Sequence, residues 1–318
     1  MLNFYKIAAN TFKESIREPI FGVLLLFAVL LIGHFPSMAL FVFSEQLKLV
    51  VDSSMATTLL FGLFVAVFSS SHTVSREMRN GTVLLLMSKP VSRWAFILAK
   101  IFGIVAASVL FVFICSTASV ISIYVAVDQF RLDLTAYLLF FGTVLVSCIV
   151  GMLLNFFRGD SFPASMALVM AVLLPIFAAF CMVFKESPAL SMPDYIMALI
   201  LLFFAVSAMA TITVVFATRL DMVANLCICS VIFFLGLISS FLFQRETGSA
   251  VLDFLCSVFY AILPNWQFFW VADALAVQQP IPMEYVIYSG IYVVIYIILC
   301  SIWAVAIFLN REIAKDAR

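Results

Sequence analysis

The sequence predicts an all-α membrane protein, a polytopic bundle of about eight transmembrane helices. Composition is the first observation behind this prediction. Hydrophobic residues make up 65% of the 318 residues and charged residues only 11%, and the mean hydropathy is +1.21. Soluble domains are about half apolar and about a quarter charged, so this composition indicates that lipid surrounds the chain.

The second observation is the length of the apolar runs. A helix needs roughly 20 apolar residues to cross a hydrocarbon core of about 30 Å. Runs that approach or exceed this length predict spans at residues 20–43, 56–73, 101–127, 136–157, 162–184, 195–217, 223–243 and 284–309. Only Arg158, Gly159 and Asp160 separate the fourth span from the fifth, so six spans with re-entrant helices are the alternative.

The distribution of basic residues predicts the orientation. With eight spans and a cytoplasmic N-terminus, most of the 17 Lys and Arg residues fall on the inner side. Those left outside are Lys48, Arg131, Lys185 and Arg245. An excess of basic residues inside is typical of membrane proteins, so both termini are expected in the cytoplasm. The localisation expected is the cytoplasmic (inner) membrane of a bacterium.

Residues 1–19 are expected to form a separate element, and residues 20–318 a single transmembrane domain. Over residues 3–17, Lys6, Asn10, Lys13 and Arg17 share one side of a helix, and apolar residues occupy the other. This pattern predicts an amphipathic helix lying along the cytoplasmic leaflet. Pro19 is expected to end this helix and start the first span, which makes an elbow.

Few side chains within the spans offer catalytic or metal-binding chemistry. The seven cysteines have no paired spacing, so neither a disulfide framework nor a metal site is expected. The zero net charge gives no reason to expect nucleic acid. His34, beside Pro36, is the titratable group within a span. It is interpreted as bonded to a carbonyl that the proline frees, with a proton relay as the alternative.

The stretch with the strongest functional signal is the cytoplasmic loop 74–100. Gly81 is expected to break the preceding helix, Thr82 to cap a short apolar helix over residues 83–87, and Pro90 to stop it before Ser92 caps the next. The alternative is a solvated loop whose basic residues only reflect the general excess of Lys and Arg on the cytoplasmic side. Five consecutive apolar residues in a cytoplasmic loop favour a protein interface.

This loop resembles the cytoplasmic loop of type-2 ABC exporter permeases. The resemblance is carried by Ser75-Arg76-Glu77, by Gly81-Thr82 and by the run from Leu85 to Arg93. The N-terminal elbow, the turn at residues 217–225 and the stretch at 263–273 also resemble that family, so the likeness extends from end to end of the chain. The apparent extra helices around 136–184 depart from the commoner family pattern.

The resemblance implies the permease subunit of a bacterial ATP-driven transporter, and hence a non-catalytic chain. The family's coupling helix would dock on a separate ATP-binding subunit, in two copies per transporter, and a second permease copy would complete a homo- or heterodimer. The residues expected at the docking site are Arg76, Glu77, Gly81, Thr82, Leu85, Ser88, Lys89, Pro90, Ser92 and Arg93. The chain has no phosphate-binding loop sequence, so ATP and Mg²⁺ are expected on the partner and no cofactor on this chain.

A second candidate site is the external stretch 244–283, which resembles the family's external re-entrant element. Its aromatic content predicts contact with the outer leaflet. An exit gate at Pro264, Asn265 and Trp266 is one interpretation, and an aromatic belt that anchors helix ends is the other. The 35 phenylalanines and the uncharged spans favour a hydrophobic or amphipathic cargo for export, but lipid-facing phenylalanine would give the same count.

Two other classes of function compete with this interpretation. An intramembrane lipid-processing enzyme would need a metal motif, a nucleophile elbow or paired carboxylates within the spans, and the sequence has none of these. A passive channel would need polar rings lining a pore, whereas the spans offer scattered Ser, Thr and Asn. Both remain alternatives.

Overall fold

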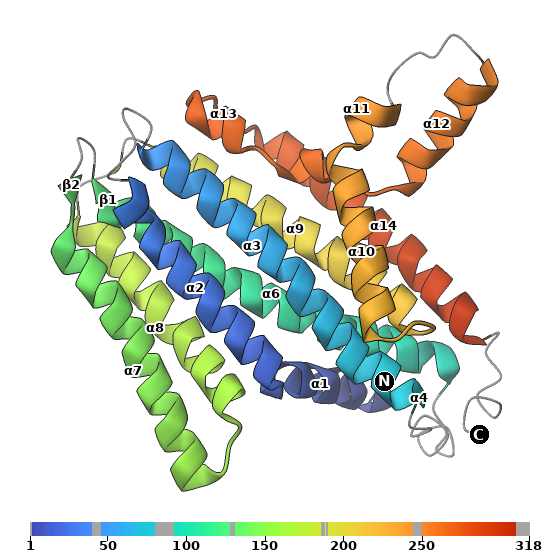
Figure 1. The fold of residues 1–318 in the computed structure, drawn as a ribbon, viewed down its shortest axis with the longest axis horizontal. Helices are drawn as coiled ribbons and strands as arrows, with labels where there is room; N and C mark the ends of the chain where they lie inside the picture. Colours follow the sequence, from blue (N-terminus) through green and yellow to red (C-terminus); the bar gives the residue numbers. More distant parts are fainter. Residues whose placement is uncertain are drawn as a thin grey trace.

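The structure is a computed structural model that describes residues 2–39, 46–79, 92–127, 131–185, 188, 190–243 and 250–309. Within these residues the chain is almost entirely helical (Figure 1). The first half contains α1 (Leu2–Arg17), α2 (Pro19–Ala39), α3 (Gln46–Ser70), η1 (Ser71–Ser75), α4 (Arg76–Arg79) and α6 (Arg93–Val125). The two-residue strands β1 (Ala126–Val127) and β2 (Arg131–Leu132) follow and pair antiparallel, with Ala126 opposite Leu132.

The second half continues with two helices that form a hairpin. These are α7 (Leu134–Arg158) and α8 (Phe162–Phe184). The remaining elements are α9 (Met192–Ala217), α10 (Met222–Leu237), α11 (Ser239–Phe243), α12 (Ala250–Ile262), η2 (Trp266–Phe269), α13 (Ala272–Ala276) and α14 (Met283–Leu309).

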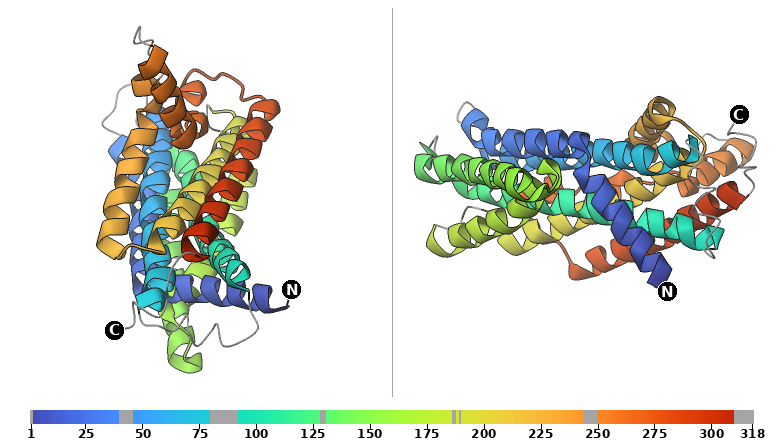
Figure 2. Two further views of the ribbon diagram at one scale, coloured as in Figure 1. Left: turned by 90° about the vertical axis from the view of Figure 1, so that its right-hand side faces the viewer. Right: turned by 90° about the horizontal axis from the view of Figure 1, so that it is seen from below.

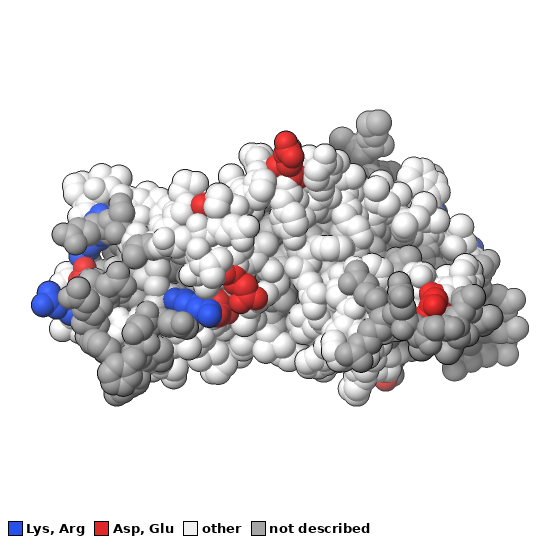
Figure 3. Space-filling model, turned by 90° about the horizontal axis from the view of Figure 1, so that it is seen from above, with Lys and Arg blue, Asp and Glu red and all other residues white. Residues whose placement is uncertain are grey.

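Seven helices in the described part of the chain are long and apolar enough to cross a membrane. They are α2, α3 with η1, α6, α7, α8, α9 and α14, and they have 21 to 33 residues. The prediction of a multi-pass helical bundle is therefore confirmed at this level. Uncharged side chains cover most of the face shown in Figure 3, as expected for a surface in contact with lipid.

The span expected at 223–243 differs from the others. Its helix α10 has 16 residues, which corresponds to about 24 Å and is shorter than a hydrocarbon core. Ile238 interrupts it before the short helix α11. The spans expected at 136–157 and 162–184 are separate long helices joined at Gly159, whose φ of 70° suits glycine at a helix end.

The centre of the bundle is formed by α6 and α9. Helix α6 packs against α1, α2, α3, α8, α9 and α14, and 78% of the apolar window of α9 is buried, against 22% for α7. Helices α7, α8 and α14 lie at the periphery and expose many apolar side chains. Such exposure is stable in lipid, because acyl chains are as apolar as leucine.

Helix α1 lies crosswise to the long helices (Figure 2). As predicted, Lys6, Asn10, Lys13 and Arg17 are exposed, and Pro19 starts α2. The opposite side of α1 packs on α6, where Gly103 permits close approach. A Cβ atom at position 103 would lie 2.6 Å from Thr11 Cβ and 2.7 Å from the Ala8 carbonyl oxygen.

The end of the bundle that carries α1 is called the elbow end here. The last turn of α3, the start of α6 and the end of α14 also lie there, since His72 contacts Glu18 and the rings of Phe96 and Phe308 stack at 6.0 Å. The β pair and α13 lie at the opposite end (Figure 1). The segments that were predicted to lie on the cytoplasmic side therefore lie at the same end of the bundle. That this end faces the cytoplasm stays a prediction.

The environment of His34 differs from the expectation. Pro36 removes the N–H that would bond the Ile32 carbonyl, and the hydroxyl of Ser122 on α6 donates to that carbonyl at 2.9 Å. The His34 imidazole instead lies 3.2 Å from the Tyr137 hydroxyl. The prediction that His34 bonds the freed carbonyl is therefore wrong, because a hydroxyl from a neighbouring helix reaches it.

Candidate functional site

The elbow end contains a turn of π-helix where α3 ends. This turn, η1 (Ser71–Ser75), leads directly into α4. Turns of this kind are rare, and they are frequent at functional sites because they shift the register of the side chains that follow. Here the side chains that follow are Arg76 and Glu77, two of the residues that the sequence analysis assigned to the docking site.

Most of the predicted docking loop lies outside the described residues. This applies to the expected short helix at 83–87 and to the predicted site residues Gly81, Thr82, Leu85, Ser88, Lys89 and Pro90. Ser92 and Arg93 are described at its far end. Ser92 is the N-cap residue of α6, as expected, but its side chain makes no capping hydrogen bond, and Arg93 is exposed at the first position of the helix.

The two ends of this loop are held together by Lys100. The side chain of Lys100 is buried, and its Nζ lies 2.8 Å from Glu77 Oε1 and 3.7 Å from Glu14 Oε2. The same Nζ donates to the Thr73 carbonyl oxygen at 3.3 Å. One ammonium group thereby connects α4, the elbow helix α1 and the π turn to α6.

In this cluster, the Glu77 and Glu14 carboxylates share one buried cation, the Lys100 ammonium group. Burial raises the pKa of the Glu77 carboxyl, while the nearby Lys100 charge and hydrogen bond lower it and Glu14 adds a smaller rise. A buried charge is costly unless it is paired. Lys100 therefore depends on Glu77 and Glu14, and the three side chains form one unit, called the Lys100 cluster below.

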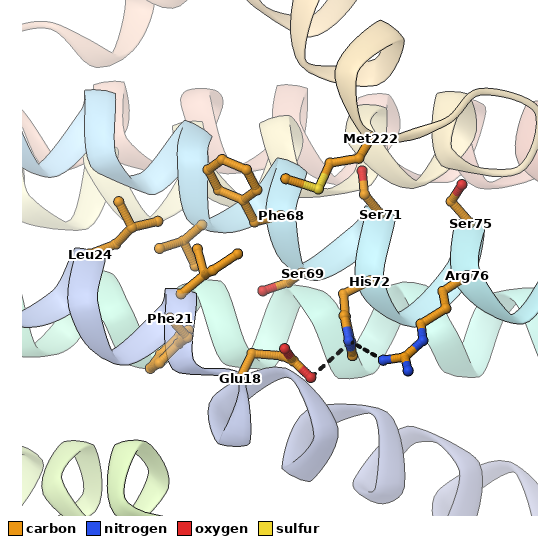
Figure 4. A pocket seen from close by; sticks show the side chains of 12 residues that line it. Glu18, Phe21, Leu24, Phe68, Ser69, Ser71, His72, Ser75, Arg76 and Met222 are labelled. Carbon is orange, nitrogen blue, oxygen red and sulfur yellow. Dashed lines mark hydrogen bonds and ion pairs between the residues drawn. The ribbon is translucent and has the colours of Figure 1, made fainter.

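A second contact joins the elbow to the π turn (Figure 4). His72 Nδ1 lies 2.9 Å from Glu18 Oε1, although the two groups are not aligned for a hydrogen bond. Arg76 Nη1 lies 2.7 Å from His72 Nε2. Arginine has only donors, so His72 Nε2 accepts in this contact.

The Glu18, His72 and Arg76 side chains border a cavity of about 350 Å³. Its walls come from the start of α2, the end of α3 with η1, and Met222 at the start of α10 (Figure 4). The rest of its lining is mainly apolar and includes Phe21, Leu24 and Phe68. In this cavity, charged side chains at the elbow end therefore lie next to apolar side chains of the bundle interior.

The π turn is also fixed to the turn between α9 and α10. Ser75 donates to the Leu220 carbonyl at 2.8 Å. The buried amide of Asn225 donates to the Ser71 hydroxyl at 3.1 Å and to the Thr213 carbonyl at 3.3 Å. Two stretches that the sequence analysis singled out separately, residues 75–77 and 217–225, therefore meet in space.

The sequence analysis missed Lys100, Glu14, Glu18, His72 and Asn225 as members of this site. One signal was present: Lys100 is a single cation within a run of otherwise apolar residues. Glu14 and Glu18 also lie one helical turn apart on the elbow, so they share a face. Neither signal predicts which residues these side chains contact, because the contacting residues belong to other helices.

The predicted external site is built differently. Pro264, Asn265 and Trp266 are all buried. The Asn265 side chain accepts from the Gln267 N–H at 3.0 Å, which starts η2, and donates to the Tyr260 hydroxyl at 3.0 Å. These contacts fix the connection between α12 and α14.

Trp266 packs against α10. Its ring lies 6.2 Å from that of Phe233, and a Cβ at Gly236 would lie 2.3 Å from the Pro264 carbonyl oxygen. Residues 244–249 of this external region lie outside the described residues. The role of Pro264, Asn265 and Trp266 as an exit gate stays a prediction.

Comparison with known protein families and curated proteins finds no match. The contacts of the Lys100 cluster, the π turn and the Asn225 amide are therefore the basis on which a function is proposed.

Proposed function

We propose that this chain is the permease subunit of a bacterial ATP-driven ABC transporter, in the inner membrane, that exports a hydrophobic or amphipathic substrate. It pairs with a second permease, identical or similar. A separate ATP-binding subunit, in two copies, docks on the loop around residues 76–93. ATP and Mg²⁺ bind to that subunit, and this chain is not itself an enzyme.

The observation that supports this proposal most directly is the position of Lys100. A docking loop transmits motion only if both of its ends are attached rigidly to the helices that must move. Glu77 precedes the loop and Lys100 follows it, and they are joined at 2.8 Å in a buried site. A force applied to the loop would therefore move α3 and α6 together.

The elbow helix and α10 extend this rigid unit. Glu14 attaches α1 to Lys100, and Asn225 attaches the α9–α10 turn to the π turn. Motion at the loop would reach α1, α3, α6 and α10 without passing through flexible chain. Of these, α6 lies at the centre of the bundle, so its movement would alter packing on several sides.

Copurification tests the proposal. The chain is extracted in mild detergent, captured by an affinity tag, and its soluble partners are identified by mass spectrometry. We expect an ATPase with a phosphate-binding loop. Leu85→Asp and Lys89→Glu should each remove it, because they change the proposed docking surface and leave Lys100, Glu77 and Glu14 unsubstituted.

Lys6→Gln is the matched control, since Lys6 is exposed on the elbow helix and lies outside the loop. Recovery of the ATPase with Lys6→Gln and its loss with Leu85→Asp would support docking at the loop. Recovery of no ATPase, or equal recovery with all variants, would contradict the proposal and return attention to a channel or a lipid-processing enzyme.

A further inference from the structure

Helix α1 and Glu18, which directly follows it, place acidic and basic side chains on two different sides of the elbow. Glu14 and Glu18 point toward Lys100 and His72, in the contacts described above. Lys13 and Arg17 instead line a cleft between α1 and the α7–α8 hairpin. Among the described residues, no acidic side chain pairs with Lys13 or Arg17.

The cleft has a volume of about 510 Å³, within the range of small-molecule sites of about 300–1,000 Å³. Its polar end contains Lys13, Arg17 and Arg158, together with Asp160 and Ser161. The Ser161 hydroxyl oxygen is buried, and no group in the described part of the chain forms a hydrogen bond with it. Ser161 also precedes the first turn of α8, whose free N–H groups favour an anion.

The other end of the cleft is apolar. It is lined by Leu154 of α7 and by Leu168, Val169, Val172 and Leu173 of α8. Leu168 and Val172 are 49% and 58% exposed, on a helix long enough to span the membrane. Cations at one end and exposed aliphatic side chains at the other match a molecule with an anionic head and an acyl tail.

We propose that this cleft binds an anionic phospholipid of the leaflet at the elbow end. Its phosphate is held by Lys13, Arg17 and Arg158, with the Ser161 hydroxyl as a donor. Its acyl chain lies along Leu168 and Val172. The site carries three cations and one carboxylate, so it selects an anionic headgroup over a zwitterionic one. The inference does not depend on the proposed transport function.

The Asp160 carboxylate would compete with the lipid phosphate for Arg158. Its Oδ2 lies 3.8 Å from Arg158 Nε, and the Arg158 side chain is largely exposed while that of Asp160 is about half exposed. A phospholipid would have to share Arg158 with this carboxylate. Asp160→Asn should therefore strengthen lipid binding, an effect that partial unfolding cannot produce. The backbone carbonyl of Asp160, which accepts from Asn155, is kept in this variant.

Native mass spectrometry of the purified full chain tests the proposal. The protein is titrated with phosphatidylglycerol and, separately, with phosphatidylcholine of the same acyl chains. A basic residue near an anionic lipid contributes a factor of about five in affinity, so the triple variant Lys13→Gln, Arg17→Gln, Arg158→Gln should bind phosphatidylglycerol about a hundredfold more weakly. Lys6→Gln, on the same helix but outside the cleft, should bind it like the wild type.

Two further arms separate the lipid from a free phosphate. Val172→Trp fills the apolar end and should weaken phosphatidylglycerol binding while leaving the cations in place. Inorganic phosphate should not displace the lipid from the wild type, because it lacks the tail. Displacement by inorganic phosphate would identify a phosphate site, and equal binding of the two lipids, or of the triple variant and the wild type, would overturn the proposal. An Asp160→Asn variant that binds phosphatidylglycerol more weakly would also contradict it.

Discussion

The ammonium group of Lys100 lies 2.8 Å from Glu77 Oε1, and it joins the two ends of a loop that the sequence places between the second and third spans. Glu14 of the elbow helix lies 3.7 Å from the same nitrogen. The elbow helix α1, helix α4 and the central helix α6 therefore form one electrostatic unit.

Removal of the Lys100 charge is expected to destabilise the protein. In Lys100→Met the Glu77 and Glu14 carboxylates lose their buried cation, and breaking a buried pair costs about 3 kcal/mol or more. Thermal unfolding in detergent measures the loss. Adding Glu77→Gln to Lys100→Met should recover part of the stability, since it removes a partly buried carboxylate that has lost the Lys100 charge. Lys6→Met is the control, and an equal effect there would rule out a special role for Lys100.

The protonation of Glu77 predicts a pH dependence. Its folded-state pKa is raised above the ordinary value of 4.5, mainly by burial. Folding then favours the protonated form, so this contribution to stability is fully present below pH 4.5 and is lost as pH rises through the folded-state pKa. Relative to Glu77→Gln, the wild type should lose stability as pH increases across that window. Parallel pH profiles of the two melting temperatures would contradict the raised pKa.

Ser122 and Pro36 are expected to be coupled. Ser122→Ala removes the donor to the Ile32 carbonyl that Pro36 leaves free, and a lost buried hydrogen bond costs about 1 kcal/mol. Pro36→Ala restores a backbone N–H for that carbonyl, so Ser122→Ala should cost less in its presence. Double-mutant unfolding measures the coupling. Ser116→Ala is the matched control, because the buried Ser116 hydroxyl on the same helix has no hydrogen-bond partner among the described residues.

Gly103 is expected to be essential for docking of the elbow helix. In Gly103→Ala the new methyl group would lie 2.6 Å from Thr11 Cβ, so α1 must move away from α6. Overpacking of this kind costs about 1–3 kcal/mol, which lowers the unfolding temperature and exposes α1 to protease. Gly142→Ala is the control, since nothing lies within 4 Å of a Cβ there. Similar effects of the two substitutions would show that the contact with α1 is unimportant.

The helix boundaries show where local sequence information was sufficient. The span predicted at 162–184 coincides with α8, and that at 284–309 differs from α14 by one residue. Helices α3 and α6 begin earlier than predicted, at Gln46 and Arg93. Their first turns contain charged residues, which end an apolar run in hydropathy but do not end a helix. The shortness of α10 was missed because residues 223–243 are uniformly apolar, and hydropathy does not detect a break at Ile238.

The candidate sites were predicted less completely. Arg76 and Glu77 were identified in the sequence, and the structure adds Lys100, Glu14 and His72 around them. The basic residues Lys13, Arg17 and Arg158 were used to predict orientation, the elbow helix and a span boundary, whereas the structure brings them from α1 and the end of α7 to one cleft. Pro264, Asn265 and Trp266 were chosen because their stretch resembles the external re-entrant element of the permease family, and the structure shows in addition that all three are buried.

Local sequence patterns were sufficient to predict a multi-pass helical membrane protein with an amphipathic elbow, because membrane thickness and helical periodicity act on neighbouring residues. The pairing of Lys100 with Glu77 and Glu14, the hydrogen bond from Ser122 to the carbonyl freed by Pro36, and the contacts of Asn225 with the π turn are visible only in the folded structure. These contacts join residues from different helices. Their existence depends on how the helices cross, and helix crossing is set by side-chain packing throughout the bundle rather than by any local pattern.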